Sequence, residues 1–259
     1  MKRPLRIGQL IAPFGPGAIY TDREGIPLVV CGLDHWFVAE HCEKFEFAVF
    51  EPRLANILKV DAFFRPADFR SVRRAMSAPP NHSLFIPAHR FPRWYRNSKT
   101  GKLHKFNLET TITTQAKEGG RWLPVRFVAV CQGGHLCEFP WKEWSGCICP
   151  PGNEDLFLTD RGGSELRTIQ VKCKNCGKKR NLAGVMTLND EGQEHDDSNK
   201  KLTSAFAKSG IRCPGERPWL GENGKKEDCQ YPLVGALINQ SNLYFPKTIS
   251  AISIPDTHP

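Results

Sequence analysis

The sequence lacks the signatures that would assign it to a membrane protein or to a familiar enzyme class. No apolar run approaches the roughly eighteen residues that cross a membrane, and the first residues, MKRPLRIGQL, are basic without the apolar stretch of a secretory signal. The chain also has no P-loop lysine motif, no His-Glu-x-x-His, no Gly-x-Ser-x-Gly and no glycine-rich dinucleotide fingerprint. We therefore expect a cytoplasmic protein without membrane contact and without catalytic machinery of its own.

The segment Gly15-Pro16-Gly17 is the nearest approach to a phosphate-binding loop. Such a loop needs several free backbone N–H groups followed by Lys and Ser or Thr at the start of a helix. Pro16 removes one of these donors, and no Lys-Ser/Thr pair follows. The segment therefore predicts a tight turn with a structural purpose.

Positive charge is concentrated in the first half of the chain. Residues 1–130 hold 20 Lys and Arg against 11 Asp and Glu, whereas residues 131–259 hold 16 of each, so the whole excess of +9 arises before residue 131. Between Arg65 and Lys105 there are ten basic residues and one acid, Asp68. This distribution indicates a local positive field that suits a polyanionic partner.

The basic segment also contains aromatic residues, a combination typical of nucleic-acid-binding surfaces. Cations neutralise phosphates, and aromatic rings stack on the bases of a single strand. The alternative is that the aromatics belong to the core and the arginines pair with acids or with a partner protein. The predicted nucleic-acid-binding residues are Arg70, Arg73, Arg74, Arg93, Trp94, Arg96, Lys99, Lys102 and Lys105.

Ten cysteines in a chain without an export signal favour reduced thiols and metal ligands over disulfides. Cys173-x-x-Cys176-Gly177 has the spacing of a zinc knuckle, in which a tight turn presents two sulfurs to one tetrahedral Zn²⁺. The nearest later cysteines are Cys213 and Cys229. We therefore predict a structural zinc site formed by Cys173, Cys176, Cys213 and Cys229; the alternatives are unliganded buried thiols and, less favoured, a redox pair.

A second group of possible ligands precedes the knuckle. Four of its five members could bind another zinc ion, but Cys147 and Cys149 are one residue apart, a spacing that seldom places both on the same metal. A nucleophilic pair of Cys131 and His135 is a further alternative, although no acyl-enzyme signature accompanies it. The group comprises Cys131, His135, Cys137, Cys147 and Cys149.

Local patterns predict an α+β fold of short strands and helices, with a zinc-knuckle or ribbon-like element in the second half. The apolar run at 26–33 predicts a strand, Pro52 suits the first position of a helix, and a second helix is expected near Pro66. The segment SKTG at 98–101 predicts a turn between two extended stretches, and the polar, acidic segment 189–201 predicts a loop. The segment 122–131 predicts one buried strand. We expect a basic α+β region over residues 1–130 and a cysteine-rich, zinc-binding region over residues 131–259.

Seven segments in order resemble the motifs of DrmB proteins of the DISARM antiphage defence system. They are GQLIAPFGPGAIY, GLDHW, EPRL, FPRW, VRFVAVCQGGHLCEFPW, RPWLG and SNLYFP. The resemblance runs from about residue 8 to the end. It implies a non-motor subunit that accompanies a DrmA-type superfamily 2 helicase and engages DNA, either single-stranded or at a duplex end.

Three departures limit what this resemblance implies. Family members often follow FPRW with a Cys-Pro-x-Cys knuckle, where this chain has YRNSKTG, and Cys137 stands where others tend to have an acid. Members also continue beyond SNLYFP into a second half with a further cysteine-bearing domain, so the functions of that half are not carried over. The alternative function is a zinc-stabilised protein-interaction module that does not contact DNA.

Overall fold

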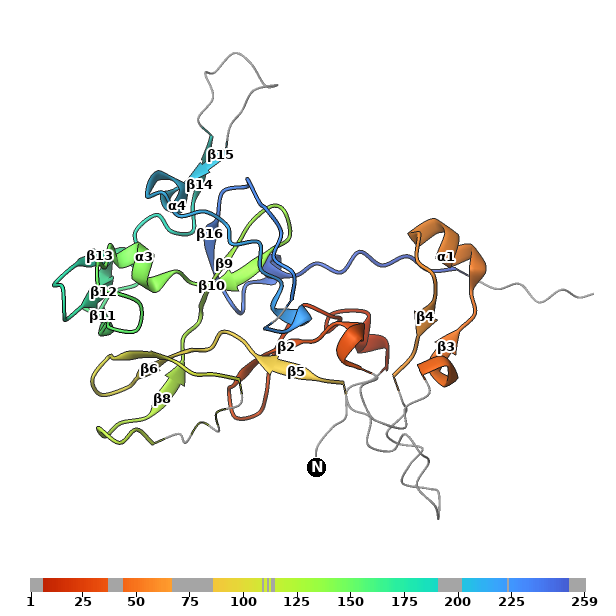
Figure 1. Cartoon of the computed structure of the whole chain (residues 1–259), viewed down its shortest axis with the longest axis horizontal. Helices are drawn as coiled ribbons and strands as arrows, with labels where there is room; N and C mark the ends of the chain where they lie inside the picture. The colour runs from red at the N-terminus through yellow and green to blue at the C-terminus, as the bar shows by residue number, and fades with distance from the viewer. Residues whose placement is uncertain are drawn as a thin grey trace, which may run out of the picture.

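The structure, a computed structural model, describes residues 7–36, 44–66, 86–108, 110, 112, 115–190, 202–222 and 224–251. It is mixed and rich in short strands, with few helices (Figure 1), in agreement with the expected fold class. The α-helices of the described part are α1 (Pro52–Leu58), α3 (Trp141–Ser145) and α4 (Ala205–Lys208).

The strands of the described residues form four three-stranded antiparallel sheets and two strand pairs. In spatial order, the sheets are β1 (Ile19–Thr21), β2 (Pro27–Val30) and β5 (Ala88–Arg90); β7 (Leu103–Lys105), β6 (Trp94–Asn97) and β8 (Trp122–Pro124); β10 (Leu136–Glu138), β9 (Phe127–Val130) and β16 (Val234–Leu237); and β11 (Leu156–Asp160), β12 (Ile169–Cys173) and β13 (Lys179–Asn181). The pairs are β3 (Ala48–Val49) with β4 (Phe63–Phe64), and β14 (Leu188–Asp190) with β15 (Leu202–Ser204).

Several local elements follow directly from the sequence. Pro52 begins α1, and Lys59 ends it in the left-handed conformation with φ of 54°. The predicted apolar strand is β2, in the middle of its sheet. The predicted SKTG turn joins β6 to β7, where the buried Asn97 Oδ1 accepts from the backbone N–H groups of Lys99 at 2.8 Å and Thr100 at 3.0 Å.

The segment 122–131 does not form one strand, as its apolar pattern predicts, because its two ends pair with different partners. β8 pairs with β6, while β9 pairs with β10 and β16. The predicted strand is therefore divided between two sheets, separated at Val125 and Arg126. The expected boundary after residue 130 lies between β9 and β10, which are neighbours in one sheet.

The larger core lies where β9, β12, α3 and α4 meet. Its fully buried aromatic side chains include Trp141, Trp144, Phe139 and Phe206, and the rings of Phe139 and Trp141 lie 4.2 Å apart between centroids. Burial of one such side chain contributes about 1.5–3 kcal/mol. This core includes four cysteines of the second half, Cys137, Cys173, Cys213 and Cys229, so it surrounds the candidate metal ligands.

The Gly15-Pro16-Gly17 segment forms a turn that packs against another sequence motif. Gly17 has φ of +89°, and a Cβ at this position would lie 3.2 Å from the Trp219 ring. A side chain there would be both strained and crowded. The glycine thus lets the turn approach the RPWLG segment.

Two expected features lie outside the described residues. These are the helix near Pro66, most of whose length falls in 67–85, and the acidic loop beyond Asp190.

Candidate metal centres

Four cysteines from two separate segments form the first candidate metal centre. Cys173 ends β12 and Cys176 lies in the turn before β13, while Cys147 and Cys149 lie in the loop after α3. Their sulfurs all lie within 4.8 Å of one another. The Cys149–Cys173 sulfur separation is 3.8 Å and the Cys147–Cys176 separation is 3.6 Å. A tetrahedral ion with Zn–S bonds of about 2.3 Å requires sulfur separations of about 3.8 Å, so this group could hold a metal ion.

The knuckle turn prepares two of these thiols for deprotonation. Gly177 has φ of +75° and donates its N–H to the Cys173 carbonyl at 3.0 Å. Hydrogen bonding from the backbone at Lys178 is the main cause that lowers the pKa of Cys176, to about 6. Burial acts to raise the pKa of Cys173, but backbone hydrogen bonds at Cys176 and Asp155 outweigh it, and the pKa is lowered. The thiolate is the form that binds metal.

The spacing argument against Cys147 and Cys149 as partners is wrong for this fold. Gly146 ends α3 in the left-handed conformation, with φ of 70°, and turns the chain out of the helix. Because α3 packs against β12 and β13, the loop that follows reaches the knuckle, and both sulfurs join the same group. The number of residues between two cysteines does not report how α3 packs against β12 and β13, so the spacing argument missed this grouping.

The second candidate metal centre comprises Cys131, His135, Cys213 and Cys229. Cys131 Sγ lies 3.3 Å from His135 Nδ1, 3.6 Å from Cys213 Sγ and 3.7 Å from Cys229 Sγ. Burial raises the pKa of Cys213 to about 12. The N–H of Gly215, which lies 3.4 Å from the Cys213 sulfur, acts to lower this pKa but does not outweigh burial. A bound cation would compensate for burying charged sulfur in this place.

A carboxylate holds His135 from the side opposite to the cysteines. His135 Nε2 lies 3.1 Å from Glu227 Oε2, and the same oxygen accepts from Arg217 Nη2 at 3.0 Å. A carboxylate on the second ring nitrogen fixes the tautomer and the orientation of a metal-binding histidine. The arrangement leaves Nδ1 directed toward the three sulfurs.

The structure divides the four predicted ligands between these two groups. Cys173 and Cys176 lie with Cys147 and Cys149, and Cys213 and Cys229 lie with Cys131 and His135. The pairing of Cys173 and Cys176 with Cys213 and Cys229 in one site is therefore not formed. Cys137, which shares the second cluster in the sequence, lies outside both groups and donates its S–H to the Ala129 carbonyl at 3.4 Å.

Part of the predicted nucleic-acid-binding set has partners within the chain. Arg93 pairs with Glu138 and Glu222, and Arg96 Nε donates to the Leu158 carbonyl at 2.9 Å. Lys102 Nζ lies 3.5 Å from an Asp155 oxygen and 3.7 Å from a Glu118 oxygen. Half-buried Trp94 packs against the larger core. Lys99 and Lys105 are exposed, while Arg70, Arg73 and Arg74 lie outside the described residues.

A second basic surface surrounds the first candidate metal centre. Lys172, Lys174, Lys178 and Lys179 are all exposed, with Arg180 beside them and no acid between 172 and 180. The turn carrying Lys99 lies next to this sheet, because Leu158 of β11 donates its N–H to the Gly101 carbonyl at 2.8 Å. These charges are visible in the sequence as the motif VKCKNCGKKRN. They were missed because the second half of the chain holds equal numbers of basic and acidic residues, so its total charge does not reveal a local cluster.

Within the described residues, none of the helices combines the length and the apolar character that a bilayer crossing requires.

Comparisons with known proteins agree with the sequence motifs. A family model for the domain of unknown function DUF8724 matches residues 6–245. The chain is 28% identical over 244 residues to the DISARM protein DrmB of Bacillus paralicheniformis, a match that covers 88% of this chain and 36% of that protein. This match confirms the resemblance to DrmB. The chain spans about a third of the length of this relative.

Proposed function

The chain belongs to the family of the domain of unknown function DUF8724, and we propose that it is a non-catalytic, DrmB-like subunit of a prokaryotic antiphage defence complex of the DISARM type. The observation that carries this proposal is the match to DrmB over 88% of the chain. The absence of a P-loop lysine motif or a hydrolase motif from the sequence is consistent with a subunit that has no motor. In this proposal ATP hydrolysis belongs to a DrmA-type superfamily 2 helicase.

The two cysteine-rich groups hold structural Zn²⁺ in this proposal. The first group gives a ribbon-like element, because its knuckle lies between the antiparallel strands β12 and β13. Both groups supply four protein ligands, which leaves no open position for substrate or water, as in structural zinc sites. The same reasoning favours Cys131 and His135 as ligands over a nucleophilic pair.

DNA contact is supported by the basic surface around the first metal centre. Among the described residues, the exposed lysines at 172, 174, 178 and 179 have no acidic partner within salt-bridge distance, and the exposed Lys99 lies on the neighbouring turn. Such a surface neutralises the phosphates of a single strand or a duplex end. The exposed Lys105, on β7 of the same hairpin, is a further candidate contact, whereas Lys102 is paired with Asp155 and Glu118.

Contact with the helicase has its own structural support. The part of the chain that contains α1, β3 and β4 lies to one side of the main sheets (Figure 1), and it exposes Phe45, Phe50 and Ile57 at 80%, 91% and 62% of their surfaces. Contiguous exposed apolar patches mark protein-contact surfaces, and we propose that these three side chains contribute to one. The alternative function, an interaction module without DNA contact, rests on this same surface.

Purification of the tagged chain from its own cells tests the proposed assembly. We expect a superfamily 2 helicase to copurify, and we expect deletion of the gene to remove protection against phage infection. A preparation without the helicase, together with unchanged protection, would contradict the assignment to a defence complex.

Mobility-shift measurements with single-stranded and blunt duplex DNA test the DNA contact separately. The variant Lys178→Glu, Lys179→Glu should bind more weakly, and because it removes two cations that neutralise phosphates, the salt slope should fall by about 1.8 on duplex DNA and by about 1.4 on single-stranded DNA. The matched control is Arg53→Glu, Lys59→Glu, which reverses two exposed charges on α1 and at its end and should leave binding unchanged. Equal binding by both variants and the parent would favour the interaction module.

A further inference from the structure

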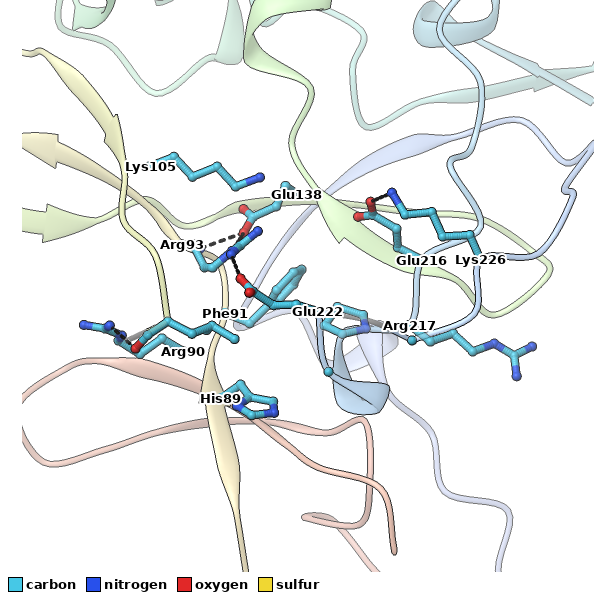
Figure 2. A pocket seen from close by; sticks show the side chains of 14 residues that line it. His89, Arg90, Phe91, Arg93, Lys105, Glu138, Glu216, Arg217, Glu222 and Lys226 are labelled. Carbon is cyan, nitrogen blue, oxygen red and sulfur yellow. Dashed lines mark hydrogen bonds and ion pairs between the residues drawn. The ribbon is translucent and has the colours of Figure 1, made fainter. Parts of the chain in front are cut away.

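A polar cavity of about 300 Å³ lies between β5, β7, β10 and the segment that joins Cys213 to Cys229 (Figure 2). No residue of either candidate metal centre lines this cavity. It is lined by charged side chains, by the apolar side chains of Phe91, Leu108 and Pro218, and by the backbone of Gly221 and Gly224. Its volume is at the lower end of the range that holds small-molecule ligands.

Three polar atoms of cavity-lining residues are buried without a hydrogen-bond partner. They are Glu138 Oε2, His89 Nε2 and Arg217 Nε, which make up three of the six such side-chain atoms found in the described residues. A buried polar atom without a partner costs free energy that a ligand or a water molecule can recover. Figure 2 shows the Glu138 carboxylate directed into the cavity, and its unpartnered buried oxygen indicates a site that is completed by a polar ligand.

Glu138 defines what one end of the ligand must offer. Its Oε1 already accepts the backbone N–H of Arg93 at 2.8 Å and lies 3.7 Å from Arg93 Nε. Figure 2 shows the carboxylate reaching into the cavity between Arg93 and Lys105. In the ionised carboxylate, the free oxygen, Oε2, can accept an N–H or O–H donor from a bound molecule.

The rest of the cavity favours an anionic group. Five Lys and Arg side chains line it against three Glu. Within the described part of the chain, Arg90 is held by carbonyl oxygens, with 2.9 Å to Asn107 and 2.6 Å to Leu108 among them, and no acid there neutralises its charge. Lys105 is exposed and acts on Glu138 from beyond salt-bridge distance. A phosphate beside Lys105 would meet this excess.

The cavity wall opposite β5 is preformed. It belongs to the segment between Cys213 and Cys229, which the second metal centre closes at both ends. Glu227 donates its N–H to the Gly215 carbonyl at 3.1 Å, and Arg217 is paired to the same Glu227 that orients His135. A preformed wall lowers the ordering cost of binding.

We propose that this cavity binds a single nucleotide with an amino-bearing base, the amino group donating to Glu138 Oε2 and the phosphate lying beside Lys105. A nucleotide combines the donor, the anion and a flat ring suited to the apolar lining. Adenine, cytosine and guanine carry an exocyclic amino group, whereas thymine and uracil do not. The inference rests on the proposed DNA contact only for the source of the nucleotide, which is either a DNA strand or a free mononucleotide.

Calorimetric titration of the full chain with two ligand pairs tests this site. The pairs dCMP with dUMP and dAMP with dIMP each exchange the amino group for a carbonyl at nearly constant size. We expect the amino member of at least one pair to bind about ten-fold more tightly, the ratio expected for one hydrogen bond to a charged group. The variant Glu138→Gln should abolish this preference, and Lys105→Met should weaken both members, whereas the control Lys117→Met, at an exposed lysine outside the cavity lining, should change neither.

Absence of binding by all four nucleotides, or an amino preference that survives in Glu138→Gln, would overturn the proposal. Circular dichroism of each variant separates loss of the site from loss of the fold. Competition with a short cytosine-rich single strand then identifies the source: displacement of dCMP indicates DNA, and retention indicates a free nucleotide. The DNA contact of the knuckle lysines is measured by a different variant, so either proposal can fail without the other.

Discussion

Replacement of Cys173 and Cys176 together by serine should remove one of two bound metal ions. The two residues supply half of the first group, and Cys173 is fully buried in the larger core beside Val171 and Leu182. Without the ion, the loop after α3 keeps only hydrogen bonds to the knuckle, such as those from the Lys174 N–H to the Asp155 carbonyl at 2.8 Å and from Asn175 Nδ2 to the Asn153 carbonyl at 2.6 Å. We expect about two equivalents of zinc in the parent protein and about one in the variant, because the second group keeps all four of its ligands.

The magnitude of the effect follows from the position of the first group within the core. Structural zinc in finger peptides binds with about 10–16 kcal/mol, which is comparable to the whole stability of a typical domain, about 5–15 kcal/mol. Loss of a structural metal is among the changes that cost more than about 4 kcal/mol. For a chain of this size, a loss of about 4 kcal/mol lowers Tm by roughly 8–16 °C.

Elemental analysis and thermal unfolding measure the two quantities on the same samples. The control variant is Cys137→Ala, a buried cysteine from the same part of the sequence that lies outside both groups. It should keep both equivalents and lose about 1 kcal/mol, as small core truncations do. A parent protein that contains no zinc and melts identically with and without chelator would refute the reasoning, as would a double variant that retains both ions.

Three other changes have defined outcomes. Glu227→Gln removes the charge that orients His135, so competition with a chromophoric chelator should show metal affinity at the second group lowered about 10–100-fold. Asn97→Ala removes the acceptor of two turn N–H groups, so unfolding experiments should show a loss of about 2 kcal/mol. Burial raises the pKa of Glu138 above its ordinary value of 4.5; folding therefore favours its protonated form, and this contribution is lost as pH rises through the raised pKa. Relative to Glu138→Gln, the parent Tm should fall with rising pH, and a difference that stays constant with pH would contradict this.

Local signals in the sequence predicted the elements that depend on neighbouring residues. Pro52 at the start of α1, the turn between β6 and β7, and the Cys173–Gly177 knuckle all depend on contacts within a few residues. The grouping of ligands depends on packing between distant segments. Cys131 and Cys229 are 98 positions apart and meet because β9 pairs with β16, whose strand begins five residues after Cys229.

The basic stretch between Arg65 and Lys105 also shows that long-range partners cannot be predicted from local sequence. Its charges were correctly located in the sequence, but a cation's availability depends on which acids the fold brings to it. Glu222 is 129 positions from Arg93 and Glu138 is 45 away, yet both pair with it. The cavity-lining role of Glu138 could not be predicted from its own sequence neighbours either.

With metal bound as proposed, the two candidate metal centres would constrain different parts of the fold. The first joins segments 24 to 29 positions apart, within one sheet and the loop beside it. The second joins Cys131 to residues 82 and 98 positions away, and so ties β9 to the segment that forms the cavity wall. The entropic cost of closing a loop grows with its length, so the second centre constrains the chain more. Loss of the ion at Cys131 should therefore disturb the nucleotide cavity directly, whereas loss of the ion at Cys173 should act mainly on the knuckle lysines.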